Sequence, residues 1–144
     1  MLSTASSPTF GRPSALASAY ARVGVETRVN VASAHQLIQL LFDGFIDNVM
    51  KARAAIRMKQ IEAKGRAIGK AVRIIDEGLK ASLNMADGGK LAEDLSALYG
   101  YVSLRLTVAN LRNDETALEE CTRLIQPLRE AWAEIGPQVD GDRA

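Results

Sequence analysis

The sequence has very few of the residues that build catalytic centres, disulfides and metal sites. It contains one cysteine, one histidine and 5% aromatic residues. A single Cys121 excludes an internal disulfide and is typical of a reducing compartment. One His and one Cys supply no tetrahedral zinc set, and they do not stand at a helical spacing that would make a nucleophile pair. Since no Gly-rich phosphate loop is present either, we predict a protein without cofactor or metal that is not an enzyme.

Two further absences limit where the chain resides. No apolar run reaches the roughly 18 residues of a membrane-spanning helix, and the N-terminus lacks the basic-then-apolar layout of a signal peptide. Lysine and arginine number 18 against 17 acidic residues, so the total charge favours neither nucleic acid nor membrane as a partner. We therefore expect a cytoplasmic protein that neither binds nucleic acid nor inserts into a membrane.

Basic residues are nevertheless concentrated between Lys51 and Lys80. Nine basic side chains, namely Lys51, Arg53, Arg57, Lys59, Lys64, Arg66, Lys70, Arg73 and Lys80, stand there against Glu62, Asp76 and Glu77. The stretch contains no aromatic residue for base stacking and no recognised nucleic-acid motif. A solvated basic face is the simpler interpretation, and a nucleic-acid-binding bundle stays open as an alternative.

The residues that are abundant indicate helices. Apolar residues make up 47% of the chain, and Ala and Leu dominate over β-branched residues. Apolar spacings of three and four predict helices over residues 33–58, 60–83, 89–112 and 115–135. The first begins at a capping box formed by Ser33 and Gln36, and the last ends at Gly136-Pro137. Short turns between four such helices predict an all-α, antiparallel up-down four-helix bundle.

The segments outside the bundle have a different composition. Residues 1–13 mix Ser, Thr, Pro and Gly without periodicity, and a short helical turn after them carries Leu16 and Tyr20 on one face. We therefore divide the chain into a mobile N-terminal arm (1–32), a bundle domain (33–137) and a disordered tail (138–144). In the first turn of the bundle, His35 is expected to contact solvent or the arm rather than a metal.

The third predicted helix carries more apolar surface than a bundle core requires. One stripe can serve the core: Leu91, Leu95, Leu98, Val102, Leu106 and Ala109. A second stripe, centred roughly 140° away around the helix, consists of Tyr101, Leu104, Val108 and Leu111. Between the stripes on one side lie only small neutral residues: Ser96, Gly100, Ser103, Thr107 and Asn110. From Leu95 to Leu111, Arg105 is the sole charged residue.

An outer helix face without charge has to be covered by another surface. We therefore predict that the second stripe binds a partner protein, together with the neighbouring Ser103, Thr107 and Asn110. A homodimer in which this stripe pairs with itself is an alternative, and a purely internal explanation also stays open. The free protein is expected to be a monomer or a weak homodimer.

The segment from Leu95 to Asp114 resembles the Leu-Tyr-x-Tyr stretch and the following Ala-Asn-Leu element of the flagellin-specific export chaperones of bacterial flagella, the FliS family. Supporting matches are Ala19-Tyr20, Leu41-Phe42-Asp43-Gly44, Lys70-Ala71 with Ile74-Ile75, and Glu130-Ala131-Trp132. The resemblance extends from Tyr20 to Trp132. Phe42 stands where the family usually has Tyr, Ala34 where it has Pro, and Gly69 and Gly78 where it has better helix formers.

The resemblance implies a chaperone of the bacterial cytosol that binds the disordered C-terminal segment of flagellin in apolar helix grooves. Such a protein prevents premature polymerisation and supports type III export, and components of the flagellar export apparatus are further implied partners. It also implies that the arm around Tyr20, which includes Leu16, lies over part of the groove when the groove is empty. A disordered segment that folds as a helix along an apolar groove is a recurrent mode of peptide recognition.

Overall fold

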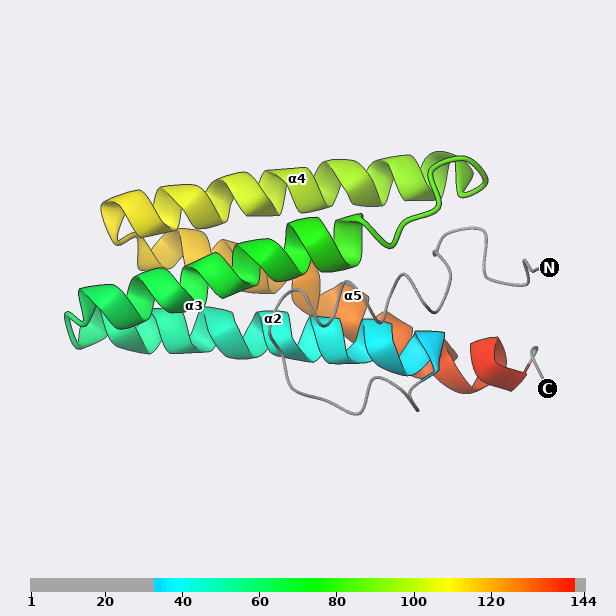
Figure 1. Cartoon of the computed structure of the whole chain (residues 1–144), viewed down its shortest axis with the longest axis horizontal. Helices are drawn as coiled ribbons and strands as arrows, with labels where there is room; N and C mark the ends of the chain where they lie inside the picture. The colour runs from blue at the N-terminus through cyan, green and yellow to red at the C-terminus, as the bar shows by residue number, and fades with distance from the viewer. Residues whose placement is uncertain (1–32, 142–144) are drawn as a thin grey trace.

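A computed structural model describes residues 33–141 of the chain. In this range the chain forms α2 (Ala34–Arg57), α3 (Ile61–Arg73), the π-helical segment η1 (Ile74–Lys80), α4 (Gly89–Arg112) and α5 (Glu115–Gly141). The helices run alternately in opposite directions along the long axis (Figure 1). Helix α2 packs against α3 and α5, and α4 packs against the same two helices. The predicted all-α up-down bundle is therefore confirmed.

The helix ends follow the local sequence at the start of α2 and between α4 and α5. At the start of α2, Gln36 N donates to Ser33 Oγ over 3.1 Å, and Ser33 N donates to Gln36 Oε1 over 2.9 Å. This is the predicted capping box. Between α4 and α5, Asn113 takes a left-handed conformation with φ of 54°, and Asp114 Oδ1 accepts from Ala117 N over 3.3 Å. The first of these ends α4, and the second caps α5.

The second predicted helix is not uniform. Its first part is α-helical, whereas Ile74–Lys80 form a π-helix. Each π-helical turn closes between residues i and i+5, so Ile74 and Leu79 are brought onto one face, and both are buried. Gly78 lies in this segment, where an added Cβ would come within 2.9 Å of a Leu41 methyl group. The glycine therefore allows α2 and η1 to approach closely.

Helix α5 is longer than predicted, and the expected end at Gly136-Pro137 is wrong. The helix continues to Gly141 and so includes the first four residues of the segment 138–144. Gly136 has another role than ending the helix: a Cβ at this position would overlap the imidazole ring of His35. A glycine that permits close packing and a glycine that ends a helix look identical in the sequence.

The core is formed by side chains from every helix, and Leu41, Phe45, Ile68, Leu106 and Leu118 are at most 1% exposed. On α4, the predicted core residues Val102, Leu106 and Ala109 are fully buried, whereas Leu95 and Leu98 are partly buried.

The prediction that Leu91 belongs to the α4 core stripe is wrong, because Leu91 is 58% exposed. The buried seam instead passes through Ala92 and Tyr99, which is 3% exposed. These positions continue the spacing of three and four set by Val102 and Leu106. The small Ala92 and the hydroxyl-bearing Tyr99 made this seam less conspicuous in the sequence than the run of leucines.

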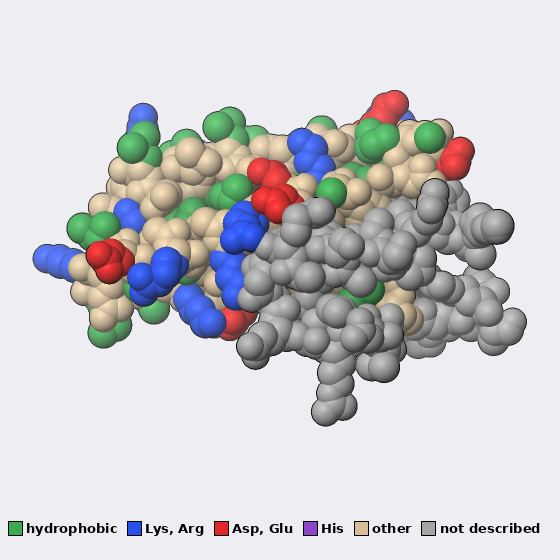
Figure 2. Space-filling view, in the orientation of Figure 1, with side chains coloured by type: hydrophobic (Ala, Val, Ile, Leu, Met, Phe, Trp, Pro, Cys, Tyr) green, Lys and Arg blue, Asp and Glu red, His purple; other side chains and the backbone are tan. Residues whose placement is uncertain are grey.

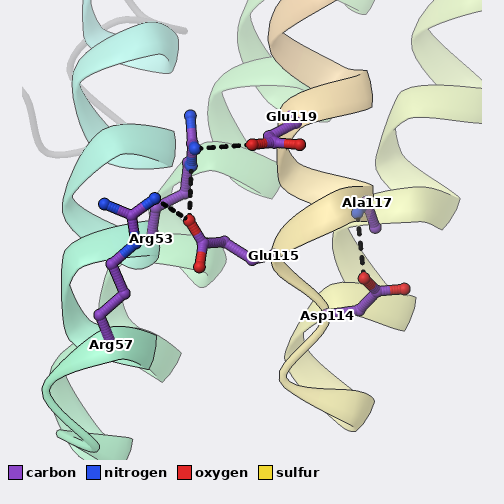
Figure 3. A network of polar contacts seen from close by, with 6 residues as sticks. All are labelled: Arg53, Arg57, Asp114, Glu115, Ala117 and Glu119. Atoms are coloured by element: carbon purple, nitrogen blue, oxygen red, sulfur yellow. Dashed lines mark hydrogen bonds and ion pairs between the residues drawn. The ribbon is translucent and has the colours of Figure 1, made fainter.

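A network of ion pairs joins the end of α2 to the start of α5 (Figure 3). Glu115 Oε1 accepts from Arg57 Nη2 over 2.6 Å and from Arg53 Nε over 3.2 Å, and Arg53 also pairs with Glu119 over 2.9 Å. The hydrogen bond from Arg57 is the main cause that lowers the pKa of Glu115, and the bond from Arg53 adds to it. Glu115 is therefore ionised in the folded protein well into the acid range.

This network predicts part of the acid sensitivity of the fold. A carboxylate with a lowered folded pKa stabilises the protein above its unfolded pKa of about 4.3, and this contribution is lost as the pH falls through the folded pKa. Glu115→Gln is therefore expected to lower stability at pH 7 and to flatten its decline below about pH 5. Urea unfolding at a series of pH values measures both effects, with Glu134→Gln, an exposed change on the same helix, as control. An unchanged slope for Glu115→Gln would contradict the role given to the network.

Candidate partner-binding site

The outer surface of α4 presents the predicted second stripe to solvent. Tyr101, Leu104 and Leu111 are 44%, 60% and 79% exposed, and Val108 is half-buried. We call these four residues the apolar face. Hydrophobic side chains protrude along the edge of the molecule that α4 forms (Figure 2). The structure therefore brings the four predicted apolar residues together on one accessible surface.

The only charge on this stretch of α4 is neutralised by α5. Arg105 Nε donates to Glu120 Oε1 over 2.7 Å, and the Tyr101 hydroxyl donates to Glu120 Oε2 over 2.5 Å. The hydrogen bonds from Tyr101 and then Arg105 lower the pKa of Glu120, which stays ionised at neutral pH. Because one carboxylate binds both side chains, the ring of Tyr101 is held at the border of the apolar face, and Arg105 is directed toward α5.

The predicted polar residues lie on the neighbouring side of α4, toward α3 and η1. Ser103 Oγ donates to Asp76 Oδ2 over 3.2 Å, and Thr107 Oγ1 donates to the Ser103 carbonyl over 3.1 Å. The carbonyl of Asn110 accepts from Lys64 Nζ over 2.8 Å, while the side chain of Asn110 is exposed. Two of these three polar side chains are therefore engaged within the bundle, and Asn110 is the most available for a partner.

A second apolar surface, which the sequence did not indicate, is a groove of about 210 Å³ at the end of the bundle where α4 begins. We call it the apolar groove. Its lining comes from α2, from η1 and the residues after it, from α4 and from α5: Ile38, Phe42, Leu79, Ser82, Leu83, Leu91, Leu95, Tyr99, Leu128, Ala131, Trp132 and Ile135. The one hint of this groove in the sequence was Leu91, an apolar residue at the first turn of α4. Helix α4 therefore contributes its first half to the groove and its second half to the apolar face.

One wall of the apolar groove is fixed by Trp132 and His35. The two rings stack with centroids 4.9 Å apart. Trp132 Nε1 donates to the His35 carbonyl over 3.0 Å, and His35 Nε2 donates to the Trp132 carbonyl over 2.8 Å. His35, which is partly buried, thus has a packing role that the sequence did not predict, in which it sets the orientation of the indole ring. Its expected contact with the arm involves residues outside the described range.

Residues 33–141 hold neither an accessible thiol nor a cluster of potential metal ligands. Cys121 is fully buried, and burial raises the pKa of its thiol to about 12, so it stays protonated and unreactive. Residues 33–141 contain no group of three or more His, Cys, Asp or Glu placed to hold a metal ion. No helix in this range is long and apolar enough to cross a membrane. The predicted arm residues Leu16 and Tyr20 lie outside the described residues.

Comparisons with known proteins point to one family. The family model described as flagellar protein FliS matches residues 16–139. The flagellar secretion chaperone FliS of Salmonella typhimurium is 48% identical over 121 residues, which cover 84% of this chain and 90% of the relative. FliSB of Pseudomonas aeruginosa, also a flagellar secretion chaperone, is 41% identical over 113 residues (78% and 89%). FliS of Escherichia coli K12 is 40% identical over 116 residues (81% and 85%).

Proposed function

The chain belongs to the FliS family of flagellar secretion chaperones, which are not enzymes, and from this premise we propose that it binds the disordered C-terminal segment of flagellin. The observation that carries the proposal is the apolar face of α4. Leu104 and Leu111 are 60% and 79% exposed on a helix whose single charge between Leu95 and Leu111, Arg105, is paired with Glu120. A surface of this kind favours a partner helix that buries its own apolar side chains against it.

The apolar groove supplies a second contact for the same ligand. The groove is enclosed by four parts of the bundle and lined almost entirely by apolar side chains, so it suits one or two large apolar side chains of the ligand. An amphipathic segment that folds on binding can occupy the groove with one part and the apolar face with another. The free energy required to order the segment lowers the net affinity, which keeps the complex releasable.

Binding of this kind accounts for a chaperone role in the bacterial cytosol. A flagellin C-terminal segment held on the chaperone is unavailable to other flagellin subunits, so premature polymerisation is prevented. The bound subunit is then delivered to type III export, with components of the export apparatus as further partners. In this proposal the bundle domain (33–137) carries both apolar surfaces.

Calorimetry tests the assignment directly. Titration of a flagellin C-terminal peptide into the full chain is expected to give 1:1 binding with a negative heat-capacity change, because apolar surface is buried. Measurements at three temperatures yield the heat-capacity change. A scrambled peptide of the same composition is the control. If no heat of binding is detected with both components at micromolar concentration, the assignment is wrong.

We further propose that the N-terminal arm (1–32) covers part of the apolar groove in the empty protein through Leu16 and Tyr20. Such an arm competes with flagellin, and the apparent affinity falls with the fraction of molecules whose groove is closed. Deletion of residues 1–22 is expected to accelerate peptide association and to increase dye binding and self-association of the free protein. Stopped-flow fluorescence and light scattering measure these effects. Unchanged kinetics, dye binding and oligomeric state in the truncated protein would remove the arm from the proposal and leave flagellin binding untouched.

A further inference from the structure

Helices α2 and α3 border an open cleft that shares no lining residue with the apolar groove. Its volume is about 510 Å³. Its described lining consists of Asn48, Lys51, Ala54, Ala55, Gln60, Ala63, Arg66, Ala67 and Lys70, and we call it the basic cleft. The residues from α2 belong to the second half of that helix, whereas Ile38 and Phe42 in its first half line the apolar groove. The two sites therefore lie at different positions along the bundle.

The basic cleft carries positive charge that the rest of the fold does not neutralise firmly. Lys51, Arg66 and Lys70 line it, and none of its described lining residues is acidic. Lys51 pairs with Asp47 over 3.1 Å and Arg66 pairs with Glu62 over 4.0 Å, but all four side chains are more than 60% exposed. Exposed pairs of this kind contribute little and are readily exchanged for a better partner. Lys and Arg side chains are prominent on the surface around α3 (Figure 2).

The floor of the cleft is apolar and is formed by small side chains. Ala54, Ala55, Ala63 and Ala67 present methyl groups from both helices. Small side chains allow a third helix to pack closely into the groove between two others. A nucleic acid would leave these methyl groups unused, because phosphates require charge and bases require aromatic or hydrogen-bonding contacts.

One polar side chain also lines the cleft beside the alanines. Asn48 is 6% exposed, and its Nδ2 donates to the Gly44 carbonyl over 2.8 Å. This bond fixes the amide orientation. With the amide nitrogen engaged in this way, the side-chain oxygen of Asn48 can accept a bond from a donor on the ligand.

We propose that the basic cleft is a docking site for an acidic amphipathic helix of a partner protein. Small apolar side chains of that helix cover the alanine floor, and Asp or Glu residues on either side of them pair with Lys51, Arg66 and Lys70. The inference does not depend on flagellin binding, since the apolar face and the apolar groove stay free when this cleft is occupied.

The first test uses a labelled helical peptide, about five turns long, with an Ala-rich stripe flanked by Glu on both sides. Fluorescence anisotropy with the full chain is expected to show binding that weakens with added salt. A matched peptide with Lys in place of Glu, and a single-stranded DNA of similar length, should bind at least about tenfold more weakly. DNA binding that is tighter than binding of the acidic peptide would overturn the proposal in favour of a nucleic-acid surface.

Two pairs of variants then separate a docking site from general charge attraction. Arg66→Glu with Lys70→Glu is expected to reduce acidic-peptide affinity at least about tenfold, whereas Lys80→Glu with Lys90→Glu, an equal change of net charge outside the cleft, should change it little.

Ala63→Leu fills the cleft without altering charge and should also abolish binding, with Ala97→Leu on α4 as control. Equal losses in both charge variants, or unchanged binding by Ala63→Leu, would overturn the proposal. Thermal melting of each variant verifies that it is folded.

Discussion

Leu104→Glu combined with Leu111→Glu is expected to abolish binding of the flagellin C-terminal peptide while the protein stays folded. Both side chains are at least 60% exposed, so a carboxylate at either position remains in water in the free protein. In the complex the same carboxylate would be buried against apolar side chains without a partner, which costs several kcal/mol. Loss of two central contacts should weaken the peptide at least about a hundredfold.

The matched control for this pair is Met50→Glu with Met85→Glu. These methionines are 61% and 50% exposed and belong to neither the apolar face nor the apolar groove, so the same chemical change is made elsewhere on the surface. Calorimetry and thermal melting should be measured on all variants. If the control loses as much affinity as the α4 pair, binding is governed by net charge. If the α4 pair melts much earlier than the wild type, the apolar face contributes to the core.

Val102→Glu should have the largest effect on stability, and we expect it to unfold the protein. Val102 is fully buried in the seam of α4, two positions from the exposed Leu104. An unpaired charge at such a site costs several kcal/mol, which is a large part of the roughly 5–15 kcal/mol that stabilises a domain. Circular dichroism and urea unfolding check the result against Leu104→Glu, which introduces the same charge into the same helix. Cooperative unfolding of Val102→Glu at the wild-type midpoint would refute the assigned packing of α4.

The contrast between Val102 and Leu104 was predictable, because helical periodicity places the two residues on opposite sides of one helix. The number of helices and the capping box at Ser33 were also predictable, and the alternating direction of the helices followed from the short turns between them. Each depends on a few residues that are close in the sequence. The resemblance to the FliS family was equally local, since it was strongest over the segment from Leu95 to Asp114, and the comparisons confirmed it.

The apolar groove could not be predicted in this way. Its walls come from four parts of the chain, and residues such as Phe42 and Trp132 have the pattern of ordinary core residues. Whether a core side chain is sealed or borders an open groove depends on how far neighbouring helices cover it at the bundle end. Leu91 illustrates this, because the same leucine that continues an apolar stripe in the sequence is 58% exposed at the first turn of α4.

The sequence by itself determined the class of fold, the uncharged outer stripe of α4 and the family, because these follow from residues that are neighbours along a helix or a motif. Only the tertiary structure decided which residues border the groove, that Gly136 makes room for His35 rather than ending α5, and that Glu120 holds both Tyr101 and Arg105. These features join helices whose relative depth and rotation are set by packing of the whole core. No local pattern carries that information, since it arises only when distant side chains meet.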